Sequence, residues 1–160
     1  MGSGKSAVGR VLARRLRYTF VDTDTIVERR AGKKIPGIVR KKGWLVFRKM
    51  ESRALRDALA RNKVVVATGG GMILDSGNRH FMKKKGMIVH LTARPETILK
   101  RVRRKPTRPL LDVANPLKEI RQLLKKRQRF YAMAGMKIST DHKTPAQLAT
   151  AILLRLRAAH

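Results

Sequence analysis

The first six residues of the chain, MGSGKS, match the last six positions of the phosphate-binding pattern G-x-x-x-x-G-K-[ST], whose first glycine would precede Met1. Glycines allow successive backbone N–H groups to point into one concavity that holds a polyphosphate. In such a loop Lys5 reaches the β- and γ-phosphates, the Ser6 hydroxyl ligates Mg²⁺, and the helix that follows adds positive potential. The alternative is a turn rich in glycine and serine before a basic helix, so the rest of the chain has to decide.

Short apolar runs alternate with stretches of helical periodicity. The run Val64–Ala67 is continuous, which is typical of a parallel strand buried on both faces. Strands that alternate with helices predict a three-layer α/β fold, a parallel sheet with helices on both faces, in which ligands bind beyond the carboxyl ends of the strands. The expected strands cover 19–21, 63–68, 87–91 and 136–138, and the expected helices cover 5–16, 25–31, 35–42, 44–60, 76–85, 96–103, 116–133 and 145–158.

The 160 residues, of which 42% are hydrophobic, suffice for one domain with a buried core, and we take 1–160 as that domain. No apolar run approaches the length that spans a membrane, and the chain opens on a polar loop instead of a signal peptide. Because cysteine is absent, disulfides and thiolate metal sites are excluded. These features predict a cytoplasmic protein without membrane partners.

Lysine and arginine number 39 against 10 acidic residues, which gives a formal net charge of +29. A charge of this size favours anionic partners, including nucleic acid. The basic residues recur on nearly every expected helix instead of gathering on one face, and the sequence carries no zinc-finger, RRM or KH signature. We therefore interpret most of the excess as solvated helix surface, while non-specific nucleic-acid binding remains open.

Two of the acidic residues, Asp22 and Asp24, lie at the end of the first expected strand. Asp22 is placed to hold Mg²⁺, directly or through water, beside Ser6. Asp24 is placed to accept a hydrogen bond from a substrate hydroxyl and to act as its base. The alternative for both is helix N-capping, most of all for Asp24, which comes just before the helix expected from residue 25.

A glycine triplet, 69–71, follows the second expected strand. It would let a substrate approach the backbone closely, or it is only a flexible turn between strand and helix. On the helix 44–60, Arg48 and Glu51 share one face. Arg48 could clamp a substrate carboxylate while Glu51 orients its guanidinium, or the two form an ordinary ion pair.

Two further arginines stand out. Arg108 lies in a loop that contains prolines, and an arginine on a mobile lid stabilises charge on a transferring phosphoryl group. Arg127 and Tyr131 are four residues apart on the helix 116–133, where Arg127 could supply a second carboxylate contact. In so basic a chain, both arginines could equally be solvated surface residues.

Taken in order, these motifs resemble the shikimate kinase family, and the resemblance covers almost the whole chain. The family has a P-loop kinase fold with a five-stranded parallel sheet, and its members transfer the γ-phosphoryl group of ATP to the 3-hydroxyl of shikimate. The motifs that carry the resemblance are MGSGKS at 1–6, Asp22-x-Asp24, Phe47-Arg48-x-x-Glu51, Gly69-Gly70-Gly71, Arg108-Pro109-Leu110-Leu111 and Arg127-x-x-x-Tyr131.

The resemblance implies roles for single residues, with Mg²⁺ as cofactor, ATP and shikimate as partners and a monomer as the working form. Residues 35–60 would form the substrate-binding region and 104–115 the lid loop. Lys5, Asp24 and Arg108 would be catalytic, and Ser6 and Asp22 would hold the metal. ATP would be bound by Gly2, Ser3, Gly4, Lys5, Ser6, Ala7, Arg101 and Arg108, and shikimate by Asp24, Arg48, Gly69, Gly70, Gly71 and Arg127.

The sequence also departs from the family pattern. Members have a buried strand ahead of the phosphate loop, so we expect the first central strand of the sheet to be missing from this chain. About five buried apolar residues at ~1.5–3 kcal/mol each would remove on the order of 10 kcal/mol, which would impair the enzyme. A start assigned at an internal methionine would account for the difference. Local departures are Val39, Trp44 and Arg129, which replace an aromatic residue, an acid and a proline.

Two alternatives to a shikimate kinase remain open. The first is a kinase for another small hydroxy acid, such as gluconate, because pocket changes such as Val39 leave room for it. The second is an inactive polycationic protein that binds nucleic acid, which steep salt-dependent DNA binding without ATP turnover would favour.

Overall fold

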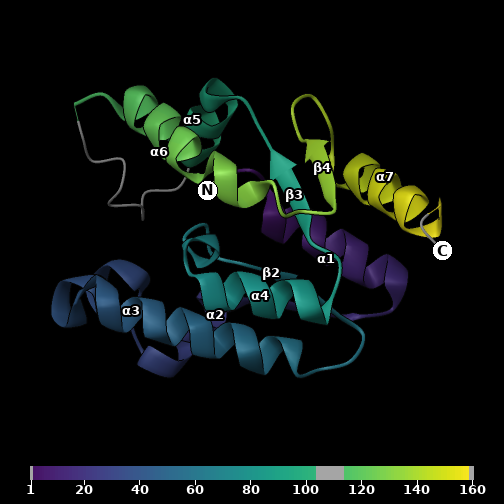
Figure 1. Ribbon diagram of the computed structural model, residues 1–160. Coiled ribbons are helices and arrows are strands. Elements are labelled where there is room, and N and C mark those ends of the chain that lie inside the picture. The colour runs from purple at the N-terminus through teal and green to yellow at the C-terminus, as the bar shows by residue number, and fades with distance from the viewer. Residues whose placement is uncertain (1, 104–113, 159–160) are drawn as a thin grey trace.

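The computed structural model describes residues 2–103 and 114–158, and its helices and strands alternate as the sequence predicts (Figure 1). The α/β class is therefore confirmed. In chain order the elements are α1 (Lys5–Leu16), β1 (Thr19–Asp22), α2 (Thr23–Ala31), α3 (Ile35–Leu59), β2 (Val64–Ala67), the 3₁₀ helix η1 (Met72–Leu74), α4 (Ser76–Lys85), β3 (Val89–Thr92), α5 (Pro95–Arg103), α6 (Pro116–Tyr131), β4 (Met136–Ser139) and α7 (Pro145–Ala158).

Local chemistry explains where α2 and α3 begin and bend. α2 starts two residues earlier than expected because the Asp22 side chain accepts a hydrogen bond from the backbone N–H of Asp24, 3.1 Å away. The N-cap of α2 is thus Asp22, and the capping role considered mainly for Asp24 was assigned to the wrong aspartate. α3 joins the two helices expected on either side of Gly43, whose φ of 78° and ψ of 166° kink it.

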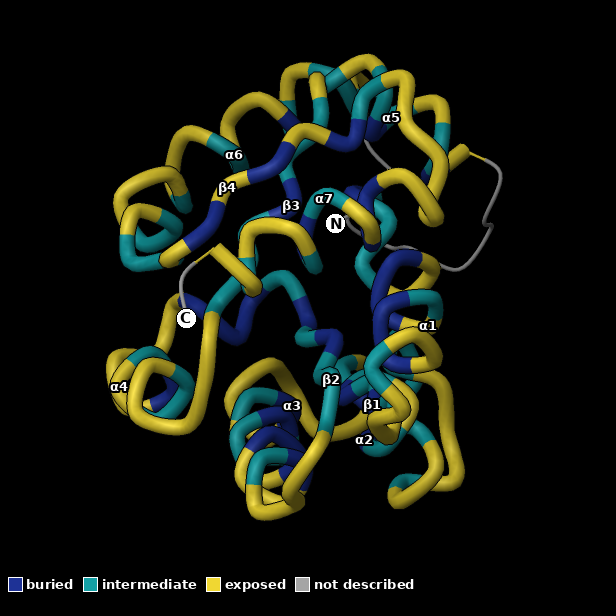
Figure 2. Tube along the Cα trace, turned by 90° about the vertical axis from the view of Figure 1, so that its right-hand side faces the viewer, coloured by how far each residue is buried: buried dark blue, intermediate teal, exposed yellow. Residues whose placement is uncertain are grey.

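The strands form two separate parallel ladders. β1 pairs with β2, from Thr19 opposite Val64 onward, and β3 pairs with β4, from Val89 opposite Met136 onward. Within the described ranges no pairing joins β2 to β3, so the single sheet expected from the sequence is present as two halves. Figure 2 shows the ladders apart, with β2 and β3 as their inner strands, which is the centre of the sheet where the resemblance predicts an absent strand.

This division changes the burial of β2. The run Val64–Ala67 was expected to be buried on both faces, but Val64, Val65 and Val66 are only half-buried. α1 covers one side of the β1–β2 ladder and α3 lies on the other (Figure 2). Because β2 is hydrogen-bonded to β1 alone among the described strands, its inner edge has no neighbour to complete the enclosure.

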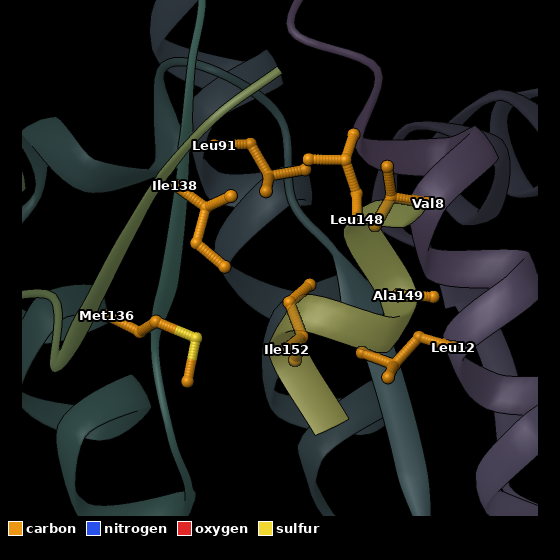
Figure 3. Close-up of a cluster of buried hydrophobic side chains, with 8 residues drawn as sticks. All are labelled: Val8, Leu12, Leu91, Met136, Ile138, Leu148, Ala149 and Ile152. Carbon is orange, nitrogen blue, oxygen red and sulfur yellow. The ribbon is translucent and has the colours of Figure 1, made fainter. Parts of the chain in front are cut away.

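α1 connects the two ladders. It packs against β1, β2 and α7, and its Val8 and Leu12 enter the largest buried cluster. Figure 3 shows these side chains facing those of α7 and of the β3–β4 ladder. Val8 and Leu12 on α1 and Leu148 and Ile152 on α7 are each four residues apart, so each pair lies on one face of its helix. The members are Val8, Leu12, Leu91, Met136, Ile138, Leu148, Ala149 and Ile152.

Two smaller clusters fix the remaining helices. Val27 of α2 packs against Ile38, Phe47 and Ala54 of α3, which holds the kinked helix against the β1–β2 half. Ile98 and Val102 of α5 pack against Ile120 of α6. None of the helices in the described parts of the chain is both long and apolar enough to cross a membrane.

The ring of His90 on β3 stacks on that of Tyr131 at the end of α6, with centroids 4.0 Å apart and planes at 14°. Burial, reinforced by Lys137 and Lys5, lowers the pKa of His90 to about 4. In the unfolded chain this histidine has an ordinary pKa near 6.5. Between about pH 6.5 and pH 4 it is therefore protonated in the unfolded chain but neutral in the folded one, so the free energy of unfolding decreases as the pH is lowered through that window.

His90→Phe keeps a ring for the stack but removes the titrating group. We expect the free energy of unfolding of the parent protein to decrease more than that of His90→Phe between about pH 7 and about pH 4.5. Urea unfolding at a series of pH values measures both. Parallel curves for the two proteins would contradict a half-buried His90 that stays neutral in the folded chain.

Candidate active site

A cavity of about 1200 Å³ opens at the carboxyl ends of the strands. The phosphate loop, the end of β1, the glycine triplet and the arginine of α3 all line it, as the topology of a parallel sheet predicts. The cavity thus brings together every predicted site residue that the structure describes: Gly2, Ser3, Gly4, Lys5, Ser6, Ala7, Asp22, Asp24, Arg48, Gly69, Gly70, Gly71, Arg101 and Arg127. Arg108 lies outside the described residues.

The phosphate loop depends on two glycines in the left-handed region. Gly2 has a φ of 65° and Gly4 a φ of 83°. A Cβ atom on Gly2 would also lie 3.0 Å from methyl groups of Ile98 and Val102, so the loop packs closely on α5. Gly4 is the N-cap of α1, and the first turn of that helix holds no acidic residue. The positive end of α1 therefore faces the cavity without a carboxylate of its own to neutralise it.

Ser6 and Asp22 meet beside this loop. The Ser6 Oγ donates a 2.6 Å hydrogen bond to Oδ2 of Asp22, whose Oδ1 accepts the capping bond of α2. A hydroxyl and a carboxylate are hard oxygen donors of the kind that Mg²⁺ prefers. In the described residues no three His, Cys, Asp or Glu side chains gather to hold a metal.

Thr23, between the two aspartates, is a structural residue that the sequence analysis missed. It is fully buried, and its Oγ1 accepts a 3.1 Å hydrogen bond from Gly69 N and lies 3.4 Å from the carbonyl oxygen of Ala67. This hydroxyl ties the end of β1 to the start of the glycine triplet. No local signal could have indicated it, because its neighbours Asp22, Asp24 and Thr25 are polar as well.

The glycine triplet is needed because side chains crowd its backbone. A Cβ atom on Gly69 would clash with Glu51 Oε1 and lie 2.7 Å from Asp24 Oδ1. A Cβ atom on Gly71 would occupy the place of the Arg48 guanidinium. The triplet therefore does more than permit a flexible turn, because it lets Asp24, Glu51 and Arg48 converge on one part of the cavity.

Arg48 forms the predicted ion pair with Glu51, which is 2% exposed. Burial raises the pKa of the Glu51 carboxyl, and the charge and hydrogen bond of Arg48 act against that rise. The guanidinium also lies 5.2 Å from the ring centroid of Trp44 and 5.4 Å from that of Phe47. The arginine is thus held by a buried carboxylate and two aromatic rings, with only part of its side chain open to the cavity.

Arg127 and Arg101 act on different parts of the cavity. Arg127 is half-buried on α6, and its charge lowers the pKa of Glu51, so it acts on the same part of the cavity as Arg48. Arg101 on α5 donates 2.9 Å bonds to Oγ1 and O of the buried Thr140 and a 3.4 Å bond to Gly2 O. Arg101 thereby joins the phosphate loop to the end of β4, while its predicted role in ATP binding stays a prediction.

A phosphate loop ahead of the first helix, two metal-type oxygens and an arginine beside an acidic group at the strand ends define a small P-loop kinase. The sequence model of the shikimate kinase family matches residues 1–157. A shikimate kinase from Persephonella marina is 43% identical over 157 residues, 98% of this chain and 94% of that protein. One from Thermus thermophilus is also 43% identical, over 98% of this chain and 85% of that protein.

Solved structures agree with the sequence comparison. Shikimate kinase from Acinetobacter baumannii in complex with shikimate superposes with a TM-score of 0.96 at 40% identity, covering 99% of this chain and 89% of that one. The enzyme from Aquifex aeolicus gives a TM-score of 0.87 at 38% identity, over 99% and 93% of the two chains. This chain belongs to the shikimate kinase family.

Proposed function

We propose that this protein transfers the γ-phosphoryl group of ATP to the 3-hydroxyl of shikimate. The observation that carries the proposal is the cavity in which the phosphate loop, Asp24 and the Arg48–Glu51 pair meet. A relative with 40% identity and the same fold is described in complex with shikimate, which supports the choice of substrate. The working unit in this proposal is one domain, 1–160, acting as a cytoplasmic monomer, with 35–60 as substrate-binding region and 104–115 as lid.

The phosphate end of the cavity would bind ATP. Lys5 lies at the start of α1, where its ammonium group and the positive helix end both favour the triphosphate. Ser6 and Asp22 would hold Mg²⁺, which, when bound, neutralises phosphate charge. Arg108, on the proposed lid, would share the charge of the γ-phosphoryl oxygens with Lys5.

Asp24 would serve the acceptor. In the reaction the 3-hydroxyl oxygen forms a bond to the γ-phosphorus while the bond to the bridging β–γ oxygen breaks and ADP leaves. The proton of the hydroxyl passes to Asp24, whose carboxylate lies beside Gly69 at the strand end. Phosphoryl transfer needs little covalent help from the protein, so the gain comes from positioning and charge neutralisation.

The carboxylate of shikimate would be held by two arginines. Arg48 is oriented by Glu51, and Arg127 acts on the same region from α6. Planar guanidinium groups bind carboxylates through two parallel hydrogen bonds. Such a contact neutralises the charge of a small acid and also sets the orientation of its ring. This fixes the distance between the carboxylate end and the hydroxyl presented to Asp24.

The decisive experiment is a coupled assay of ADP release with Mg²⁺-ATP and shikimate, gluconate or no acceptor. We expect release that depends on shikimate and stops when EDTA removes the metal. Release that depends on gluconate instead would favour the kinase for another hydroxy acid. No acceptor-dependent release, together with DNA binding that weakens steeply with salt, would favour the polycationic nucleic-acid-binding alternative.

A further inference from the structure

Arg79, on α4, lies outside the set of described residues that line the cavity, yet it touches η1, which follows the glycine triplet, and α6, which carries Arg127. Its Nη1 donates 2.9 Å hydrogen bonds to the carbonyl oxygens of both Ile73 and Leu74. The carbon Cζ of its guanidinium also lies 4.7 Å from the centroid of the Phe130 ring on α6. One side chain therefore spans from η1 to α6.

The hydrogen bonds of Arg79 complete the segment that follows the glycine triplet. η1 begins at Met72, directly after Gly71, and the backbone bonds Met72 N to Gly69 O and Leu74 N to Gly71 O join the two. A 3₁₀ helix of three residues leaves its last carbonyl groups without helical partners. Arg79 supplies a donor for two of them, so it fixes the end of the segment that carries Gly69–Gly71.

The residue before Arg79 ties the same segment to α3. Asn78 is 3% exposed, and its Nδ2 donates to Ser52 Oγ at 2.9 Å and to Met72 O at 3.4 Å. Ser52 follows Glu51, the partner of Arg48. Two consecutive residues of α4 thus hold the glycine segment against the helix of Arg48 and against the helix of Arg127.

We propose that Arg79 is a positioning residue for the acceptor site, which sets the place of α6, and with it Arg127, relative to the glycine triplet and Arg48. Phe130 is three residues, less than one turn, beyond Arg127 on α6, so a shift of the ring moves that arginine as well. The role requires arginine because one guanidinium must donate to carbonyls at its edge and stack on a ring with its face. This inference rests on the proposed function, since it concerns how shikimate is held.

The test compares Arg79→Ala with Arg129→Ala. Arg129 is an exposed residue whose Cζ also lies 4.7 Å from the Phe130 ring, and among the described residues it makes no hydrogen bond to η1, so its removal deletes a contact of the same kind without releasing that segment. We expect Arg79→Ala to raise the KM for shikimate by about tenfold, because small misplacements of binding groups are costly, while the KM for ATP changes less than about twofold. Arg129→Ala should leave both constants near those of the parent.

Further variants distinguish a positioning role of Arg79 from a purely structural one. Phe130→Leu keeps an apolar side chain and should reproduce the rise in KM, and the Arg79→Ala/Phe130→Leu double variant should exceed neither single one if both act through one contact. Arg79→Lys should recover only part of the affinity. A purely structural role would lower thermal stability and kcat without separating the two KM values, and that result, or an equal effect of Arg129→Ala, would overturn the proposal.

A failure of the proposed function is distinguishable from a failure of this inference. Trp44 is the single tryptophan of the chain and lines the cavity, so its fluorescence gives a dissociation constant for shikimate without turnover. If the parent protein neither binds nor phosphorylates shikimate, the proposed function is wrong. If the parent does both and Arg79→Ala binds shikimate as tightly as the parent, the function stands and the positioning role of Arg79 is wrong.

Discussion

Lys5→Ala should lower kcat for shikimate phosphorylation by about 10²–10³-fold, the range measured when one donor that stabilises transition-state charge is removed. Lys5 is the first residue of α1 and follows the phosphate loop, in which Gly2 and Gly4 adopt left-handed backbone conformations. The first turn of α1 contains no acidic residue of its own. Steady-state kinetics at saturating shikimate and ATP measure the effect.

The control for Lys5→Ala must account for the net charge of +29. Lys84→Ala removes the same charge from an exposed position on α4 and should leave kcat within about twofold of the parent. Lys5→Arg keeps the charge but changes the compact ammonium into a larger planar group, so we expect little recovery. Equal losses in Lys5→Ala and Lys84→Ala would mean that overall charge, not the loop, governs the reaction.

Arg48→Ala should raise the KM for shikimate by about 10- to 100-fold, the equivalent of a charged hydrogen-bonded contact of about 1.5–3 kcal/mol. It should also destabilise the fold by about 3 kcal/mol, because Glu51 stays buried without its partner. Burial already raises the pKa of Glu51, and without Arg48 it rises further. The deficit should therefore grow as the pH increases from about 5 to about 8, since the unfolded chain then releases a proton that the folded chain retains.

A second substitution separates the two consequences of losing Arg48. Arg48→Ala/Glu51→Gln removes the buried charge, so we expect urea unfolding to show most of the lost stability restored. The KM for shikimate should stay high, because no guanidinium returns to bind the carboxylate. A double variant that regained affinity together with stability would contradict the clamp, and an unchanged KM in Arg48→Ala would rule it out directly.

The sequence predicted the location of the candidate site residues better than the pairing of the strands. Residues 1–6, Asp22, Asp24 and the glycine triplet could be placed at one edge because a parallel topology brings all strand ends there, whatever the details of packing. The Arg48–Glu51 pair followed from helical spacing alone. These inferences rest on local chemistry or on topology, and the cavity confirms that the residues meet.

What the sequence could not predict depends on contacts between distant parts of the chain. The half-burial of Val64–Val66 follows from which strands pair, which an apolar run does not specify. The junction role of Thr23 depends on Gly69 lying within 3.1 Å of it. The contacts of Arg79 with η1 and with Phe130 depend on how α4 and α6 lie relative to each other. Nothing in the local sequence pattern therefore distinguishes Arg79 from other arginines on helix surfaces.

Because the two strand ladders are separate, ligands bound between them can stabilise the fold. One wall of the cavity belongs to the β1–β2 half through Asp22 and Gly69, and another to the β3–β4 half through Thr140 and Lys143, with α1 between them. A ligand that fills the cavity would contact residues of both halves and act as a non-covalent crosslink. At a concentration a hundred times its dissociation constant, such a ligand would add about 2.7 kcal/mol to the free energy of unfolding. Substrate binding and the stability of the fold would therefore be linked in this chain.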